Sequence, residues 1–238
     1  MKFFPFFVFF ISLMSSAVVL AEETDAGVAT LEKALASRKP PIRADEISAT
    51  PLPGLYQVVL GRQVVYMDAN AEYMLDGDLM NLKSQINYTE NAKSKIRLNA
   101  IAALGEENML VYRPAKVEHK ITVVTDIDCP CCRRLHNEVP EYLENNVEVR
   151  YIFMPLKGAK DRKKTESVWC SDDRQEALDI AKAGGEIEEK TCDNPLDKQM
   201  QTARQLGVRG TPAIILESGE MLPGYMPVKK LVAELRKN

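Results

Sequence analysis

The sequence lacks an excess of charge of either sign, and this absence argues against one class of partner. Its 238 residues include 31 Lys and Arg against 34 Asp and Glu, which gives a net charge of −3. A nucleic-acid-binding domain usually carries a basic patch or stripe, and none stands out along this chain. We therefore expect no nucleic-acid partner.

Charge is also absent from one long stretch near the start of the chain. No charged residue interrupts Phe3–Ala21, Lys2 precedes it, and Val19-Leu20-Ala21 fits a small-x-small cleavage site. We expect residues 1–21 to be a secretory signal peptide, with the mature chain beginning at Glu22. An uncleaved membrane anchor is the alternative, although a proline and three serines weaken a spanning helix of about 20 residues.

Cysteine and histidine are absent from residues 22–86. Val28–Arg38 has the pattern of a short amphipathic helix, which ends at Pro40-Pro41. Short β-branched runs separated by turn residues follow between Ile42 and Leu82 and predict a small meander of strands. This part of the chain offers no metal-ligand spacing, so we expect a sheet that packs or pairs with another chain.

The second half has a different order of elements. A charged helix is expected over Glu90–Ala103, and the domain boundary near Asn87. The β-branched run Ile121–Val124 leads into the segment Cys129-Pro130-Cys131-Cys132, a helical pattern follows, and Val147–Phe153 has the pattern of a strand. A C-x-x-C pair inside such a βαβ unit is typical of a thioredoxin-like redox site.

The position of the C-x-x-C pair indicates which cysteine attacks. A helix N-terminus carries partial positive charge and unpaired N–H groups, which stabilise a thiolate. Cys129 stands at this N-terminus and is the predicted nucleophile, while Cys132, one turn into the helix, is the predicted resolving thiol. Pro130 suits the first turn, where its missing N–H has no helical partner. A permanent Cys129–Cys132 disulfide is the alternative.

Several motifs in both halves are shared with one known family. They are Gly54-Leu55-Tyr56-Gln57-Val58-Val59, Val65-Tyr66-Met67-Asp68, Asp76-Gly77-Asp78-Leu79, Thr125-Asp126-Ile127, Val168-Trp169-Cys170, Gln205-Leu206-Gly207-Val208, Gly210-Thr211-Pro212-Ala213 and Pro223-Gly224-Tyr225. Together with the C-x-x-C pair they make residues 40–237 resemble the DsbC/DsbG family of periplasmic disulfide isomerases.

The resemblance implies a fold and an organisation. Residues 22–86 would form an α+β N-terminal dimerisation domain, and residues 87–113 a linker helix region. Residues 114–238 would form an α/β thioredoxin-fold catalytic domain with a helical insertion.

The resemblance also implies an activity and its partners. The chain would be a periplasmic thiol–disulfide isomerase and reductase that acts on misoxidised exported proteins, without a cofactor or a metal. It would work as a homodimer whose sites are kept reduced by a membrane reductase of the DsbD type.

Two further sites are expected from the motifs. The resemblance implies a cis bond between Thr211 and Pro212, beside the active cysteines, where a substrate strand would pair; an ordinary trans proline is the alternative. Cys170 and Cys192 bracket a short helical segment and are expected to form a structural disulfide, with a second redox couple as the competing interpretation.

The active segment departs from the family in holding a third cysteine. Cys131 is expected to be a spectator thiol, but competition with Cys132 and a vicinal bond to it are open alternatives. A soft-metal cluster with His136 is another, although we expect His136 to lie on the helix surface. Asp126 and Asp128 are of uncertain role, because a carboxylate disfavours a nearby thiolate while the helix N-terminus favours it.

Alternative functions follow from the same features. The chain is expected to be an enzyme, but a chaperone-like protein with a secondary redox role would have the same fold. A dithiol oxidant is a third hypothesis, because Cys-Pro-x-Cys also occurs in oxidants, and Thr211 and the long N-terminal half argue against it. A soft-metal-binding protein is the fourth.

Overall fold

The computed structural model describes the backbone of residues 16–237 and the side chains of residues 26–237. Most of the predicted signal peptide, residues 1–15, lies outside this range, and residues 16–21 belong to the first helix. Within the described residues, no helix has both the length and the apolar character that crossing a membrane requires. The chain divides into two compact units between Gly77 and Asp78.

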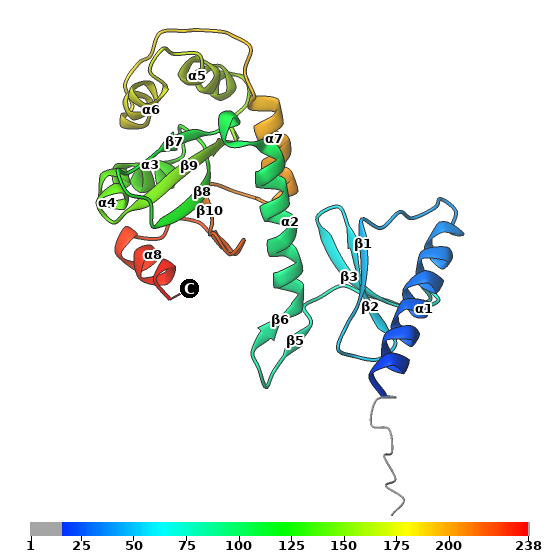
Figure 1. The fold of residues 1–238 in the computed structure, drawn as a ribbon. Coiled ribbons are helices and arrows are strands. Elements are labelled where there is room, and N and C mark those ends of the chain that lie inside the picture. Colours follow the sequence, from blue (N-terminus) through cyan, green and yellow to red (C-terminus); the bar gives the residue numbers. More distant parts are fainter. Residues whose placement is uncertain (1–15, 238) are drawn as a thin grey trace, which may run out of the picture. The chain divides into compact units, whose positions relative to one another are not determined.

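The first unit is a helix on a small antiparallel sheet (Figure 1). The sheet has the order β1-β2-β3-β4. The elements are α1 (Ser16–Ala36), β1 (Glu46–Ala49), β2 (Leu55–Leu60), β3 (Gln63–Asp68) and β4 (Met74–Leu75). The predicted meander is therefore present, and the helix begins well before the expected Val28.

The core of the first unit lies between α1 and the sheet. Leu31 and Leu35 are one turn apart on the helix, so they share a face, and both are buried against Val58 and Val65. A side chain at Gly27 would collide with the ring of Tyr56, because its Cβ would lie 1.7 Å from the Tyr56 hydroxyl oxygen. The helix therefore approaches β2 closely at this glycine.

The second unit contains a hairpin, a long helix and a five-stranded sheet of order β11-β10-β8-β9-β7. Its elements before the sequence Cys-Pro-Cys-Cys are β5 (Met80–Asn81), β6 (Ile86–Asn87), α2 (Tyr88–Leu104), the 3-10 turn η1 (Glu106–Asn108), β7 (Leu110–Tyr112) and β8 (His119–Thr125). The later elements are α3 (Pro130–Asn137), α4 (Val139–Glu144), β9 (Val147–Phe153), α5 (Ala159–Trp169), α6 (Arg174–Ala183), α7 (Leu196–Gln205), β10 (Ala213–Ile215), β11 (Met221–Pro223) and α8 (Val228–Leu235).

Strands β8 and β9 are parallel and the other neighbours are antiparallel. Helices α3 and α4 connect β8 to β9, so the predicted βαβ unit is present. Because successive side chains of a strand face opposite sides, Val123 and Val124 enter different cores. Val123 packs among residues of α3, α4, α6 and α8, and Val124 packs among residues of α2 and α7. Figure 1 shows these helix groups on opposite sides of the sheet.

Helix α2, predicted as the linker, is bonded to the five-stranded sheet within the second unit. Its N-cap is Asn87, whose side chain accepts a hydrogen bond from the backbone N–H of Glu90. Arg97 is buried and donates both to Glu90 and to the carbonyl oxygen of Gly219, in the turn between β10 and β11. The predicted boundary near Asn87 thus falls at the start of this helix, whereas the two compact units separate ten residues earlier.

Candidate active site

The segment with three cysteines crosses from the end of β8 to the start of α3. Strand β8 ends at Thr125, and Cys129 is the N-cap of α3 in an extended conformation. The Cys129 carbonyl accepts the first helical hydrogen bond, from Arg133 at 3.0 Å. Pro130 occupies the first helical turn. Cys129 therefore lies at the positive end of the helix, as the spacing predicted.

Asp126 holds the loop between strand and helix. It is buried, and its Oδ1 accepts the backbone N–H of Asp128 at 2.8 Å while its Oδ2 accepts the backbone N–H of Leu156 at 3.0 Å. The carboxylate thus ties the active loop to the segment that follows β9. Asp126 therefore stabilises the conformation of the loop between β8 and α3.

Cys129 and Cys132 differ in exposure and in acidity. Cys129 is partly exposed and Cys132 is 1% exposed. Partial burial opposes the Cys129 thiolate, but hydrogen bonds led by the backbone N–H of Cys132 outweigh it and lower the pKa of Cys129. Burial raises the pKa of Cys132. At neutral pH Cys129 therefore has the larger thiolate fraction and is the better nucleophile, whereas Cys132 stays mostly protonated.

Thr211 and Pro212 reach the cysteines through the pairing of β10 with β8. Ala213 lies opposite Val124, so the residues just before β10 lie beside the end of β8. The bond between Thr211 and Pro212 is cis, and Cys129 Sγ lies 3.3 Å from the Thr211 carbonyl oxygen. The Thr211 hydroxyl oxygen is buried and has no hydrogen-bond partner among the described residues.

The carboxylate of Asp128, the residue before Cys129, is paired with two cations. Its Oδ1 accepts hydrogen bonds from Lys164 and from Arg133, both at 2.8 Å. The bond to Lys164 is the largest of the influences that lower the pKa of Asp128. The carboxylate is thus ionised and paired on two sides, which reduces the repulsion that it exerts on a Cys129 thiolate.

Cys131 is exposed, whereas Cys132 is buried. His136 is 6% exposed, so the expectation that it lies on the helix surface was wrong. Its ring nitrogens lie 3.0 Å from the hydroxyl of Tyr151 and 2.9 Å from Asp179, and burial lowers the pKa of His136 to about 4. Among residues 26–237 no group of three His, Cys, Asp or Glu side chains is arranged to hold a metal ion.

The helical insertion, which contains α5 and α6 and lies between β9 and α7, carries a disulfide. Cys170, after α5, and Cys192, in the loop before α7, are bonded with an S–S distance of 2.08 Å and enclose α6. Ser167 Oγ accepts the backbone N–H of Lys190 close to the bridge, so the loop is also fastened by hydrogen bonding. The bridge is distant in sequence from the other three cysteines, which are free.

Three residues near the thiols were not identified from the sequence. They are Lys164, Asp161 and Lys182, all contributed by the insertion. Asp161 is buried, and this burial raises its pKa. Lys182 follows Leu178 by one turn of a predicted helix. A basic residue on this apolar face was the sequence signal that could have indicated a buried lysine.

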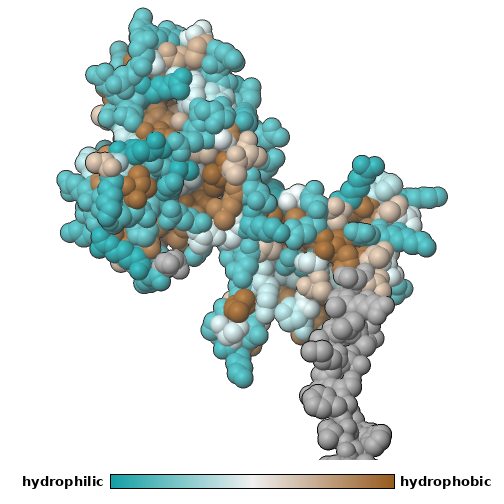
Figure 2. Space-filling model, in the orientation of Figure 1, coloured by the Kyte–Doolittle hydropathy of each residue, from teal (hydrophilic) through white to brown (hydrophobic). Residues whose placement is uncertain are grey.

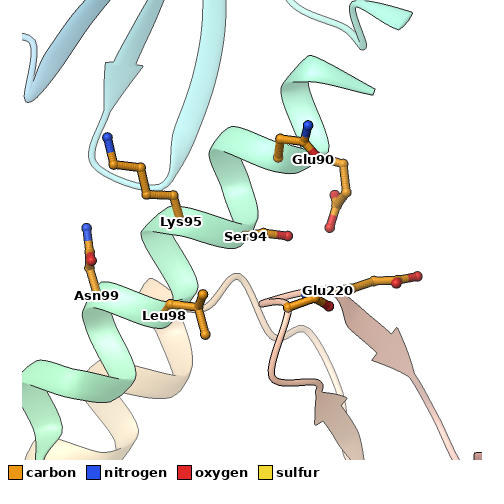
Figure 3. Close-up of a pocket in the computed structure, with 8 residues that line it drawn as sticks. Glu90, Ser94, Lys95, Leu98, Asn99 and Glu220 are labelled. Atoms are coloured by element: carbon orange, nitrogen blue, oxygen red, sulfur yellow. The ribbon is translucent and has the colours of Figure 1, made fainter. Parts of the chain in front are cut away.

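A surface pocket lies between α2 and the turn that joins β10 to β11. Figure 3 shows Ser94 and Leu98 extending from α2 toward Glu220, whereas Lys95 and Asn99 point to the other side. None of the residues that line this pocket is a predicted site residue. It is an open surface pocket whose lining residues, apart from Leu98, are of polar types.

Comparison with known proteins covers both halves of the chain. Residues 21–90 match the disulfide bond isomerase protein N-terminal domain, and residues 106–238 match the thioredoxin-like domain. A crystal structure of a disulfide interchange protein from Neisseria gonorrhoeae is similar with a TM-score of 0.51 and 28% identity. The similarity covers 56% of this chain and 97% of the other.

Curated relatives match over nearly the whole length. The thiol:disulfide interchange protein DsbC of Salmonella typhimurium is 32% identical over 221 residues, which cover 92% of this chain and 91% of the relative. DsbC of Dickeya dadantii is 32% identical, covering 82% and 81%. DsbC of Pasteurella multocida is 34% identical, covering 80% and 83%. These matches span both folded units and the three-cysteine segment, and the chain belongs to the DsbC family of thiol:disulfide interchange proteins.

Proposed function

We propose that this chain is a periplasmic thiol–disulfide isomerase and reductase that rearranges wrong disulfides in exported proteins. The observation that carries the proposal is the division between two thiols three residues apart. Cys129 is accessible at a helix N-terminus with a lowered pKa, and Cys132 is buried with a raised one. An enzyme of this class needs such a division between an attacking and a resolving thiol.

The first chemical step is attack by Cys129. Its thiolate attacks one sulfur of a substrate disulfide, the substrate S–S bond breaks, and the other substrate sulfur leaves as a thiolate that takes a proton. A mixed disulfide then joins Cys129 to the substrate. The carbonyl oxygen of Thr211 at 3.3 Å from Cys129 Sγ supports a substrate strand pairing with the backbone at this edge.

The mixed disulfide has two fates. If a substrate thiolate attacks the mixed disulfide, Cys129 is released as a thiolate, the substrate gains a different disulfide, and no net oxidation occurs. If Cys132 attacks instead, the substrate sulfur leaves reduced and a Cys129–Cys132 disulfide forms, so two electrons have passed to the substrate. The buried position of Cys132 supports the first fate as the default, because it slows the resolving attack.

After the second fate the site needs a reductant. We propose that a membrane reductase of the DsbD type returns two electrons to the Cys129–Cys132 disulfide. Export by a signal peptide over residues 1–21 would place the chain in the periplasm beside that reductase. The Cys170–Cys192 bridge is compatible with an oxidising compartment.

We further propose that residues 22–86 hold a homodimer. This segment exposes several large apolar side chains: Tyr73, Met74, Leu75, Met80, Leu82 and Ile86, with Tyr73 at 74% and Leu82 at 79% exposure. Figure 2 shows such apolar surface on the hairpin of β5 and β6. Strand β4 is also an edge strand, whose unpaired backbone groups can pair with another chain.

Reactivation of scrambled ribonuclease tests the proposed activity. The mature wild-type chain should restore ribonuclease activity in a redox buffer, and Cys129→Ser should abolish the restoration. A chaperone-like function is separated by the Cys129→Ser, Cys132→Ser double variant in an aggregation assay with a substrate that holds no disulfide.

The outcomes of these two assays are distinct. Reactivation by Cys129→Ser at the wild-type rate would overturn the assignment of the nucleophile. Absence of reactivation by the wild-type chain, together with full suppression of aggregation by the double variant, would favour the chaperone-like function.

A further inference from the structure

Lys182 is a buried cation that the proposed exchange reaction does not yet use. It stands in the last turn of α6, where helix carbonyl groups favour positive charge, and its side chain is enclosed with only 2% exposed. Its Nζ donates to the Thr125 hydroxyl oxygen at 2.7 Å and to the Asp126 carbonyl oxygen at 2.8 Å. A lysine is seldom buried unless it is paired, so its position requires a reason.

The partners of Lys182 are also the surroundings of Cys132. The Thr125 hydroxyl and the Asp126 backbone, which bind the ammonium group, are also among the groups that act to lower the pKa of the Cys132 thiol, so the two side chains share two neighbours. The ammonium charge acts directly on the thiol and favours its thiolate. Nζ has three donors, and the hydrogen bonds found in the described residues occupy two of them.

The titratable and charged groups around Lys182 come from two elements. Asp126 follows β8, the two active thiols and Arg133 belong to the start of α3, and His136 stands one turn further along α3. Burial lowers the pKa of Lys182 to about 8, so the side chain is mostly protonated at neutral pH. The negative partner that forms during turnover is the Cys132 thiolate, because Asp126 is already bonded to two backbone N–H groups.

We propose that Lys182 is a positioning residue for the resolving step, in which its buried ammonium group stabilises the thiolate of Cys132. This inference rests on the proposed exchange function and deepens it. The insertion that carries α6 would then set how long a substrate stays bound through the mixed disulfide.

In the resolving step, Cys132 replaces the substrate sulfur as the partner of Cys129. The Cys132 thiol loses its proton to solvent, and the thiolate beside Lys182 attacks the sulfur of Cys129. The bond between Cys129 and the substrate breaks, and the substrate sulfur leaves as a thiolate that takes up a proton from solvent. Over the initial attack and this step together, the cysteine pair has lost two electrons and the two sulfurs of the substrate disulfide have gained them. Lys182 keeps its own proton throughout, because it acts by charge.

Stopped-flow reaction with 5,5′-dithiobis(2-nitrobenzoate) separates the two thiols. In a reduced Cys131→Ser background, one equivalent of the reagent releases one coloured thiolate when Cys129 attacks and a second when Cys132 resolves. In Lys182→Met the second phase should be about tenfold slower at pH 7, and its pH profile should move up by about one unit. The first phase should stay within about twofold.

Three further variants make the result specific. Lys182→Gln can still donate to Thr125 without a charge and should slow the second phase as Lys182→Met does. Lys182→Arg keeps the charge and should restore part of the rate. Lys190→Met removes a cation of the same insertion that pairs with Asp172 and Glu188, and both phases should be unchanged.

The outcomes distinguish this inference from the proposed function. A second phase of unchanged rate and pH profile in folded Lys182→Met or Lys182→Gln would overturn the role of Lys182. Absence of the first phase in the background chain itself would instead overturn Cys129 as the nucleophile. Equal slowing in Lys182→Arg and Lys182→Met would show that packing, and not charge, is responsible.

Discussion

Lys164 Nζ lies 2.8 Å from Oδ1 of Asp128, the residue immediately before the attacking cysteine. Arg133 approaches the same oxygen at the same distance. The insertion therefore supplies one of two cations that pair with a carboxylate next to Cys129. A carboxylate beside a nucleophilic thiol would otherwise raise the pKa of that thiol.

Loss of Lys164 should weaken the nucleophile. In Lys164→Met the Asp128 carboxylate keeps only Arg133, so the pKa of Cys129 should rise and its alkylation by iodoacetamide at pH 6 should slow by about threefold. Lys160→Met, on the same helix, is the matched control and should alkylate at the wild-type rate. Equal rates in the two variants would contradict the pairing argument.

Cys132 and not Cys131 should resolve the mixed disulfide. Residues three apart share a helix face, and Cys131 is exposed while Cys132 is buried beside Cys129. Cys131→Ser should keep the reductase turnover of wild type, measured by insulin reduction. Cys132→Ser should accumulate mixed disulfides with substrate on non-reducing gels. The opposite pattern would make Cys129 and Cys131 the active pair.

The Cys170–Cys192 bridge should stay oxidised when the active pair is reduced. Its role is to close the loop that holds α6, so the double variant Cys170→Ser, Cys192→Ser should lose about 3 kcal/mol of unfolding free energy in urea. Mild dithiothreitol followed by alkylation and mass mapping should label Cys129 first. Labelling of Cys170 at the same rate would indicate a second redox couple.

His136 should make stability depend on pH between about 4 and 6.5. Burial lowers its folded pKa to about 4, so in this range the unfolded chain binds a proton that the folded chain does not. The free energy of unfolding should therefore rise with pH, by up to about 3 kcal/mol from this residue. Urea unfolding at pH 4.5 and 7 measures the rise.

The His136→Gln variant provides the comparison for that measurement. It removes the titrating group, so its free energy of unfolding should change less between the two pH values than that of wild type. The hypothesis fails if His136→Gln keeps the full wild-type dependence.

Charge on strand β4 should dissociate the proposed homodimer. Met74 and Leu75 are exposed apolar residues of an edge strand, so Leu75→Lys should give a monomer in sedimentation at micromolar concentration. Leu52→Lys, at an exposed leucine between β1 and β2, is the control and should stay dimeric. A wild-type monomer at the same concentration would refute the dimer itself.

The local spacing of the sequence was sufficient to place the two predicted active thiols at the start of a helix. Cys129 and Cys132 are three residues apart after a strand, and backbone geometry alone places such a pair at a helix start. The β-branched runs and turn residues likewise predicted the parallel pair β8 and β9. The expected helix over Val28–Arg38 began too late, because residues 16–21 were assigned to the signal peptide and the polar run Glu22-Glu23-Thr24-Asp25 has no apolar periodicity.

Tertiary structure decided everything that depends on distant segments meeting. The approach of Thr211 to Cys129, 82 residues away, follows from the register of β10 on β8. The family resemblance implied this approach, and the local pattern did not. The burial of His136 and the placement of Lys182 and Lys164 depend on how the insertion folds back over α3. The sequence pattern around a polar residue of a helix is the same whether its side chain faces water or a buried partner. Only the packed structure provides the partner that makes its burial favourable.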